Sequence, residues 1–374
     1  MIGRRQKNSV PELGADGPSW QGLALRVGAG SAYNGVMHIT LVDDSIPFDG
    51  FSPATRALGG AEKAFASLAG ALVRQGHQVR VYNRARFPLM IEGAHWETLD
   101  VGFPSQTDAL IAFRKPSLLS SVRLAGRRLL WVTASARQLE PARKALDSFR
   151  PHLLFLGATQ QAAWNNPEGL SVSVVEPGVR PDFTADVASQ MAAAPTAIVT
   201  THPAHGLEFV LDLWAQKVLP AVADARLLVV SALMDKGRSG AELEPEMQAL
   251  LAKAQGTPGV DIVAPGSDST MAALYRSARV HLYPGHPDDM ACWTLMESQA
   301  CGLPAVARPL GAVFERLRDG STGQMVPDAE AFANVAIRLL TDDAMFGAMG
   351  QAARQTQRGR GWDRVAAEVT ALLA

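Results

Sequence analysis

The sequence predicts an α/β protein made of two Rossmann-like domains, each built on a parallel β-sheet. Apolar runs of strand length alternate with amphipathic segments of about 10–15 residues, which is the pattern of strands joined by crossover helices. The chain also has 374 residues, more than one hydrophobic core usually organises. Because ligands of such sheets bind beyond the carboxyl ends of the strands, two domains in series would place a cleft between them.

The first series of strands predicts a domain over residues 37–183. Residues 1–36 lack apolar periodicity and are rich in Gly, Ser, Ala and Pro, so we expect a poorly ordered extension there. A helix is expected from Ala61 to Gln75, since Gly76 suits a left-handed position after its last turn. The apolar runs predict strands at Met37–Val42, Val79–Tyr82, Ala109–Ala112, Arg128–Val132, Leu153–Leu156 and Val172–Val175.

A second series predicts another domain over residues 184–354, entered through an Ala- and Asp-rich connection at 184–195. Its expected strands are Thr196–Thr200, Arg226–Val230, Val260–Val263, Val280–Tyr283, Ala305–Ala307 and Gln324–Val326. Its expected helices are Leu207–Leu219, Glu242–Ala254, Ser269–Ala278, Trp293–Gly302, a short one around Phe314, Glu330–Leu340 and Met345–Gln357. A last helix, Asp363–Leu373, belongs to a segment (355–374) that we expect to pack across the domain boundary; Trp362 would lie at that boundary or anchor the helix at the surface.

Composition and charge exclude several classes of protein. The net charge is −1, so the chain lacks the electrostatic footprint of a nucleic-acid-binding protein. Its two cysteines, Cys292 and Cys301, cannot form a disulfide framework and do not have metal-ligand spacing with any group of histidines. We expect neither a secretory signal nor a spanning helix, because the sequence has no apolar run of about 18 residues and none follows the basic start Arg4–Lys7. These features favour a cytoplasmic protein, and they are compatible with peripheral contact at the inner face of the membrane.

The segment from Asp289 to Pro304 is the most informative part of the sequence. It follows the apolar run Val280–Tyr283 and a Pro/Gly loop, which places Asp289 on the loop and Glu297 about one turn inside the next helix. The N–H groups at a helix start favour an anion, and a carboxylate there can accept hydrogen bonds from sugar hydroxyls. Two acids alone would also fit an ordinary strand-to-helix turn. The tail from Ala300 to Pro304, Ala-Cys-Gly-Leu-Pro, makes the stretch specific.

This segment resembles the donor-nucleotide signature of family 4 retaining glycosyltransferases, in which two acids separated by seven residues precede a small-residue helix that ends in Cys-Gly-x-Pro. The resemblance covers about residues 37–374 and implies the GT-B fold, in which two Rossmann-like domains face each other across a cleft. It implies that Glu297 binds the ribose hydroxyls of a nucleotide diphosphate sugar and that Asp289 acts catalytically at the sugar ring. The helix start would complete the nucleotide site through Cys292, Trp293 and Thr294. Cys292 would act through its backbone, since the family often has Gly there.

Gly59 and Gly60 form the second part of the expected donor site. Glycine allows close approach of the backbone, and the free N–H groups of the helix that follows can bind a diphosphate. An isolated Gly-Gly pair also serves as a helix cap without a ligand. The stretch from Gly59 to Tyr82 is similar to the first helix of the family's acceptor domain, which implies that both glycines touch the donor phosphates and sugar.

Two positions depart from the family pattern. Thr200 and His205 stand where the family usually has an Arg and then a Lys or Arg before a Gly, the cations that neutralise the leaving diphosphate. A histidine carries positive charge only when protonated, and its ordinary pKa lies near 6.5. A bound diphosphate would raise that pKa, so we expect His205 to be the catalytic cation. Lys236 and Arg238 could supply charge to the same donor site, or could be solvated charges.

The histidine that many relatives carry at the end of an acceptor-domain strand is also missing. The equivalent stretch is either Phe113–Pro116 or Thr133–Ala134, and neither contains a histidine. In the first of these, Arg114 and Lys115 would bind an anionic acceptor or be solvated. The resemblance implies a metal-independent enzyme without a cofactor. It would transfer a hexose from a nucleotide diphosphate sugar to a saccharide or lipid-linked acceptor with retention, in bacterial envelope polysaccharide or glycolipid synthesis. The competing hypothesis is a catalytically weakened sugar-nucleotide-binding protein, or a partner subunit, on the same scaffold.

Overall fold

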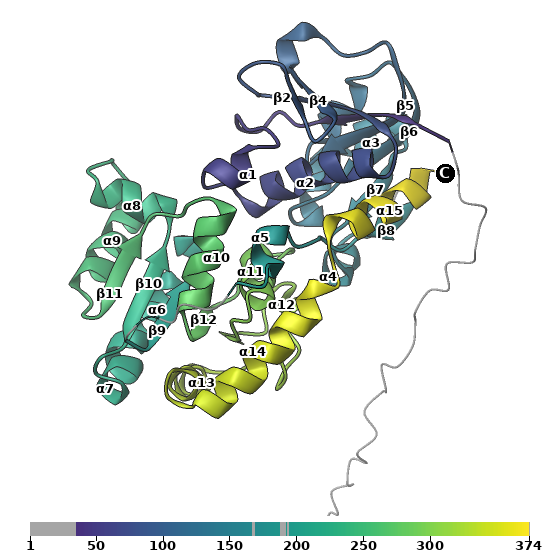
Figure 1. Ribbon diagram of the computed structural model, residues 1–374. Coiled ribbons are helices and arrows are strands. Elements are labelled where there is room, and N and C mark those ends of the chain that lie inside the picture. Colours follow the sequence, from purple (N-terminus) through teal and green to yellow (C-terminus); the bar gives the residue numbers. More distant parts are fainter. Residues whose placement is uncertain (1–34, 167–168, 188–191, 193, 374) are drawn as a thin grey trace, which may run out of the picture. The chain divides into compact units, whose positions relative to one another are not determined.

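The computed structural model describes residues 35–166, 169–187, 192 and 194–373 of the chain (Figure 1). Residues 35–374 form one compact unit, and the extension expected at 1–36 lies outside the described residues apart from Gly35 and Val36. Both expected parallel sheets are present, so the predicted fold class is confirmed.

The first sheet has eight strands in the order β3-β4-β2-β1-β5-β6-β7-β8. All pairs are parallel except β3 with β4. The strands are β1 (His38–Val42), β2 (Gln78–Asn83), β3 (Leu89–Ile91), β4 (Ala94–Thr98), β5 (Gln106–Phe113), β6 (Leu124–Trp131), β7 (His152–Phe155) and β8 (Val172–Val174). Sequence analysis missed β3 and β4. β3 is an edge strand of only three residues, Leu-Met-Ile, which is too short to stand out as an apolar run. β4 alternates apolar residues with His95 and Glu97, so it does not form a continuous apolar run.

The second sheet is entirely parallel and has the order β11-β10-β9-β12-β13-β14. Its strands are β9 (Thr196–Val199), β10 (Arg226–Val230), β11 (Val260–Val263), β12 (Val280–Tyr283), β13 (Ala305–Ala307) and β14 (Gly323–Met325). The strand order reverses between β9 and β12, and such a switch point opens a crevice at the carboxyl ends of the strands. Two expected site segments therefore start beside this crevice, one after each of these strands.

The helices alternate with the strands as expected. In the first half they are α1 (Ser52–Thr55), α2 (Gly60–Arg74), α3 (Arg143–Phe149), α4 (Ala158–Ala162) and α5 (Pro181–Thr184), with short 3₁₀ helices at Leu99–Val101, Pro116–Ser120 and Ala136–Ala142. In the second half they are α6 (Leu207–Leu213), α7 (Leu219–Ala221), α8 (Ala232–Arg238), α9 (Pro245–Gly256), α10 (Asp268–Ser277), α11 (Trp293–Ala300), α12 (Val313–Arg316), α13 (Ala329–Thr341), α14 (Asp343–Arg358) and α15 (Trp362–Leu373), with a 3₁₀ helix at Pro203–His205.

The short helices α1, α3, α4 and α5 were not expected from the sequence, and two helical segments of the second half also differ from expectation. The single helix expected over Leu207–Leu219 contains a π-helical turn at Trp214–Val218, and α8 occupies a stretch in which no helix is expected from the sequence. The side chain of Ser231 caps α8 by accepting a hydrogen bond from the backbone N–H of Met234. A Ser at this position is a start signal that sequence analysis overlooked.

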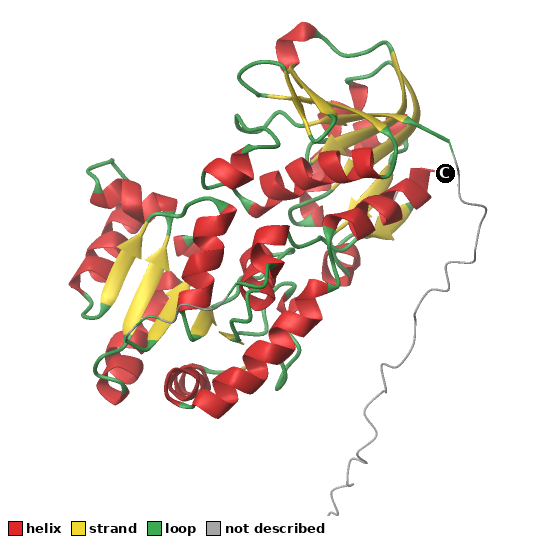
Figure 2. Cartoon of the chain, in the orientation of Figure 1, coloured by secondary structure: helices red, strands yellow, loops and turns green. Residues whose placement is uncertain are grey.

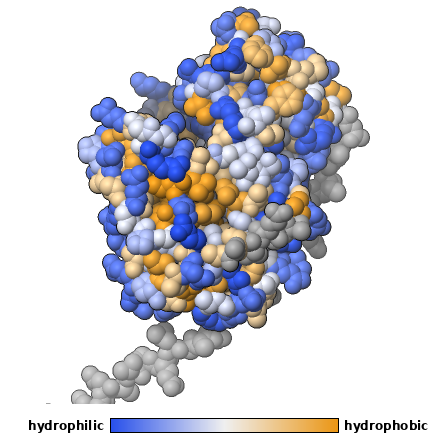
Figure 3. Space-filling model, turned by 60° about the vertical axis from the view of Figure 1, so that its left-hand side comes forward, coloured by the Kyte–Doolittle hydropathy of each residue, from blue (hydrophilic) through white to orange (hydrophobic). Residues whose placement is uncertain are grey.

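Each sheet is buried on both faces, and the helices (red in Figure 2) cover them. In the first half, one core includes Ile39, Phe65 and Trp131, and the other includes Leu110, Leu130 and Phe155. The second half likewise has one core against α6, α9 and α13 and another against α10 and α11. On the face that Figure 3 shows, mainly hydrophilic side chains border an apolar area.

The C-terminal helix α15 packs against α2 of the first half. Trp362 is buried and makes an edge-to-face contact with Trp131, with 6.2 Å between the ring centroids. Burial excludes the surface-anchor alternative for Trp362 and favours its role at the boundary. The exact domain limits, 37–183, 184–354 and 355–374, remain predictions. None of the described helices is long and apolar enough to cross a membrane.

Candidate active site

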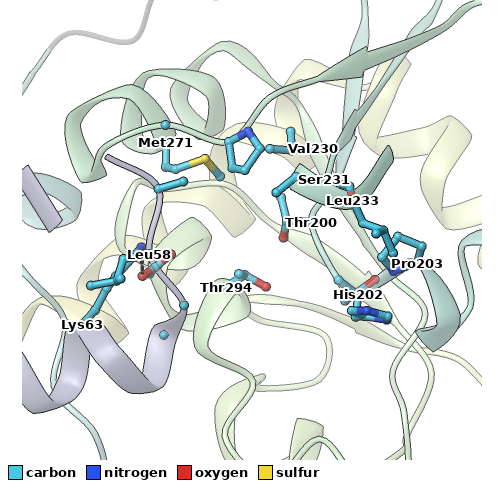
Figure 4. Close-up of a pocket in the computed structure, with 18 of the residues that line it drawn as sticks. Leu58, Lys63, Thr200, His202, Pro203, Val230, Ser231, Leu233, Met271 and Thr294 are labelled. Atoms are coloured by element: carbon cyan, nitrogen blue, oxygen red, sulfur yellow. Dashed lines mark hydrogen bonds and ion pairs between the residues drawn. The ribbon is translucent and has the colours of Figure 1, made fainter. Parts of the chain in front are cut away.

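A pocket of about 470 Å³ lies at the carboxyl ends of β9, β10 and β11 (Figure 4). Its lining comes from two distant parts of the chain. The first half contributes Ile46, Ala57, Leu58, Gly59, Gly60 and Lys63, and the second contributes Thr200, Thr201, His202, Pro203, Val230, Ser231, Ala232, Leu233, Pro265, Gly266, Met271, Thr294 and Glu297. Apolar atoms predominate, and the only lysine, arginine or carboxylate side chains in this lining are Lys63 and Glu297. Such a pocket suits an uncharged ring system with a few polar anchors.

Glu297 lies on α11 and lines the pocket, as expected for a ribose-binding carboxylate. It is 8% exposed, and its Oε1 atom lies 2.8 Å from the Nζ atom of Lys63. Lys63 also forms an ion pair with Asp268, at 2.9 Å. Burial raises the pKa of Glu297, whereas the charge and hydrogen bond of Lys63 lower it. The carboxylate is thus already held by a cation that sequence analysis did not identify.

Gly59 and Gly60 line the pocket at the start of α2. A Cβ atom added at Gly60 would lie 2.2 Å from Cγ of Trp293 and 2.4 Å from its Cβ. The absence of a side chain at Gly60 therefore lets α2 approach the start of α11. Trp293 itself packs on the core of the first half and does not line the pocket, whereas Thr294 does.

Replacing Gly60 by Ala is expected to destabilise the protein by about 1–3 kcal/mol, because the new methyl group would overlap the root of the Trp293 side chain. Gly59→Ala is the matched control, since its methyl group would meet only the carboxylate end of the Glu62 side chain and not the root of a ring. Thermal melting of the two variants checks this. Equal melting temperatures would show that α2 does not depend on this close approach.

Asp289 does not face the pocket with a free carboxylate. Its Oδ1 atom accepts a hydrogen bond from the backbone N–H of Cys292 at 2.8 Å, and its Oδ2 atom accepts one from the hydroxyl of Tyr283. It is absent from the pocket lining. In this state the carboxylate holds the turn that starts α11. A role at the sugar ring would use its remaining lone pairs and stays a prediction.

Cys292 occupies the turn in the left-handed conformation, with φ 51° and ψ 46°. This is the backbone that glycine adopts most readily, and it agrees with the expectation that the backbone matters here. The side chain is fully buried, and burial raises the pKa of its thiol well above the usual value. An inert thiol in a strained turn is not a nucleophile.

Cys292→Val is expected to lower the free energy of unfolding by about 2 kcal/mol, because a β-branched residue tolerates the left-handed conformation poorly. Cys292→Gly removes this strain and should stay close to the wild type. Cys301→Val provides a second control, because Cys301 is also buried but has a right-handed backbone. Chemical denaturation distinguishes these outcomes. A Cys292→Val variant as stable as Cys301→Val would contradict the assigned strain.

Thr200 points into the cavity from the end of β9 (Figure 4). Its hydroxyl lies 3.0 Å from Nε2 of the buried His281, whose Nδ1 atom lies 2.8 Å from the hydroxyl of Ser298. Burial lowers the pKa of His281 to about 3, so its ring is neutral near pH 7. This group therefore supplies hydrogen bonds but no positive charge where the family usually has an arginine.

His205 belongs to a group of histidines after β9 and β12. Its ring stacks on His286, with 4.0 Å between centroids and 12° between planes, and lies 5.4 Å from the ring of His202. Burial lowers the pKa of His205, and the charges of His286 and His202 lower it further. Of the three, only His202 lines the pocket. His205 is therefore a neutral ring beside the site until an anion or a lower pH protonates it.

The other cations that sequence analysis singled out lie elsewhere or are paired. Lys236 and Arg238 are exposed in the last turn of α8, outside the pocket lining, and Arg238 pairs with Asp235 at 2.6 Å. Arg114 pairs with Glu62 and has a left-handed backbone, with φ 67°. Lys115 pairs with Asp44 at 2.7 Å. An anionic acceptor would have to displace these carboxylates from Arg114 and Lys115.

Three functional candidates were missed by sequence analysis. Lys63 follows the Gly-Gly turn after two residues, and its place one turn inside α2 was the available signal. Arg308 follows β13 and donates hydrogen bonds to the backbone oxygens of Pro284 and Gly285. Its Nη2 atom lies 3.3 Å from the position that a Cβ atom on Gly206 would take. His286, the third, has no local sequence signal, because only the fold brings it onto His205.

Known proteins resemble this chain in sequence and in fold. Residues 196–342 match the family model for glycosyl transferases group 1. D-inositol 3-phosphate glycosyltransferase of Kribbella flavida is 32% identical over 210 residues, which cover 52% of this chain and 49% of that relative. The chain thus spans about half the length, or less, of the curated relatives that it matches first.

Residues 196–342 belong to the group 1 glycosyltransferases. This segment contains the signature from Asp289 to Pro304, so the resemblance inferred from those residues is confirmed at the level of the group 1 glycosyltransferases.

Solved structures show the fold of the whole described chain. Sucrose-phosphate synthase from Thermosynechococcus elongatus has a TM-score of 0.68 at 16% identity, over 90% of this chain and 98% of the other. Anabaena Alr3699/HepE, solved in complex with UDP and glucose, has a TM-score of 0.65 at 14% identity, over 90% and 99%. These likenesses confirm the expected GT-B fold around the group 1 segment.

Proposed function

We propose that the chain is a family 4 retaining glycosyltransferase that transfers a hexose from a nucleoside diphosphate to a saccharide or lipid-linked acceptor. The observation that carries this proposal is the pocket at the switch point of the second sheet, where Glu297 and the Gly59–Gly60 turn meet. UDP-sugars are the donor class we favour, because Alr3699/HepE was solved with UDP and glucose.

The residues suggest a division of roles within this reaction. Glu297 accepts hydrogen bonds from the ribose hydroxyls, and the apolar side chains around Leu233 and Met271 enclose the base. The leaving phosphate takes the proton of the acceptor hydroxyl, so the protein mainly positions both substrates and stabilises the charge that develops. No protein base and no metal ion is required in this scheme. Transfer would occur in the cytoplasm, at the inner membrane face where the acceptor is lipid-linked.

A panel of nucleoside diphosphate sugars in a thermal-shift assay tests the proposed donor class. The expected result is a rise in melting temperature with a UDP-sugar, and with UDP alone, because ligands that bind the folded state stabilise it. A donor that passes this screen is then incubated with saccharide and lipid-linked acceptors, and released UDP is measured. A full panel without any shift would contradict the proposed donor class.

A sugar-nucleotide-binding protein without turnover is the second candidate. Two observations favour it: Thr200 contacts the neutral His281, and Lys63 is already paired with two carboxylates. The pocket lining therefore offers no unpaired permanent cation to a leaving diphosphate. Binding of a sugar nucleotide without hydrolysis or transfer would favour this second function. The assays should cover about pH 5.5–9, a range that includes the ordinary pKa of histidine.

A further inference from the structure

Four charged side chains behind the pocket form a buried, electrically neutral cluster. Lys63 contacts Glu297 and Asp268, and Arg180 contacts the second oxygen of Asp268. Arg180 also donates a hydrogen bond to the hydroxyl of Ser67, at 2.7 Å. The side chain of Lys63 is 9% exposed and that of Asp268 is fully buried. Water therefore screens these charges weakly, and each depends on its partners for its ionised form.

The members of this cluster come from both halves of the chain. Lys63 and Ser67 lie one turn apart on α2, beside the first sheet, whereas Asp268 begins α10 and Glu297 lies on α11. Arg180 immediately precedes α5. The hydroxyl of Tyr275 on α10 and the thiol of Cys301 are further buried titratable groups near Glu297, and burial raises the pKa of both, which keeps them neutral. Lys63 is thus the cation in direct contact with Glu297.

We propose that Lys63 is a positioning residue for the nucleotide site: it keeps Glu297 ionised and fixes its orientation, so that the carboxylate can accept hydrogen bonds from the ribose. The inference rests on the proposed function. Glu297 uses Oε1 for Lys63, which leaves Oε2 for the ligand. Because Lys63 belongs to the first half of the chain, nucleotide affinity depends on a residue outside the segment that carries the signature.

Removal of Lys63 leaves Asp268 and Glu297 buried with Arg180 as the remaining cation, which touches Asp268. The pKa of Glu297, which burial already raises, must then rise further because the opposing charge is gone. A protonated Glu297 accepts weaker hydrogen bonds than the carboxylate does. Ribose affinity should therefore be poor at low pH and recover as the pH rises through the raised pKa of Glu297.

Calorimetric titration of the full chain with UDP tests the inference. The titrations run from about pH 5.5 to about pH 9, so that they span the raised pKa of a buried carboxyl group. In the wild type, the Glu297 carboxylate is expected to make UDP affinity depend little on pH. Lys63→Met should bind UDP at least about tenfold more weakly at the acid end, with affinity recovering toward the alkaline end. Lys63→Arg should restore most of the affinity, because it keeps the charge. Arg74→Met, on the same helix and in exposed ion pairs, is the matched control and should bind as the wild type does.

A Lys63→Met variant that binds UDP with wild-type affinity and pH profile would overturn the inference while leaving the proposed function intact. Wild-type protein that binds no nucleotide would instead overturn the proposed function, and the inference with it. If Lys63→Met does not fold, Lys63→Gln keeps a hydrogen-bonding side chain without the charge and should show the same pH-dependent loss. Equal affinity of Lys63→Gln and the wild type at every pH would also overturn the inference.

Discussion

Glu297→Gln is expected to weaken UDP binding at least about tenfold, because a charge-assisted hydrogen bond to the ribose is worth roughly 1.5–3 kcal/mol. The structure adds a second effect that the sequence did not suggest. The same substitution leaves the buried Lys63 with Asp268 as its remaining carboxylate. Loss of one partner from a buried ion pair typically destabilises a protein by about 3–5 kcal/mol. The neutral amide retains a hydrogen bond to Lys63, so we expect the lower end of that range.

Calorimetry with UDP and chemical denaturation measure these two effects separately. Glu330→Gln is the matched control, since Glu330 forms an exposed ion pair with Lys217 and should change neither quantity. Unchanged UDP affinity in a folded Glu297→Gln protein would remove Glu297 from the nucleotide site. Unchanged stability would show instead that Asp268 alone satisfies Lys63.

His205→Ala is expected to slow sugar transfer, because it removes about 2–4 kcal/mol of transition-state stabilisation. This is the usual effect of losing one strong electrostatic donor. In the ligand-free protein the pKa of His205 is lowered, first by burial and then by His286 and His202, while Asp289 and Asp288 oppose this. A bound diphosphate favours the charged ring and raises that pKa. Turnover should thus be high below the pKa of the complex and fall as the pH rises through it.

Turnover of UDP-sugar against pH for the wild type, His205→Ala and His205→Lys checks this role. His205→Lys should stay active at alkaline pH, because its ammonium remains charged there. His286→Phe, which keeps a stacked ring but removes one lowering charge, should shift the falling limb of the wild-type profile toward higher pH. If His205→Ala matched the wild type at every pH, the cationic role would pass to Arg308, whose guanidinium lies beside Gly206.

Most of the fold could be predicted because local patterns determine it. Strands such as β1 and β9 are rich in apolar, β-branched residues, and Gly76, two residues after the end of α2, has a φ of 91° as the sequence suggests. The signature from Asp289 to Pro304 was recognisable for the same reason, since its residues act within a single strand-to-helix turn. Elements without such a local signal, the short strands β3 and β4, were missed.

The sequence alone determined the alternation of strands and helices, the GT-B resemblance and the place of Glu297 on α11. The tertiary structure alone decided which charges are available. Lys63 meets Glu297 across 234 residues, and His205 stacks on His286 from a different strand end. The carboxylate of Asp289 accepts a hydrogen bond from the backbone N–H of Cys292 in the turn that it caps. The reason is physical. The charge and hydrogen-bonding capacity of a side chain depend on its burial and on the partners that folding brings to it. The spacing of residues along the sequence reveals neither.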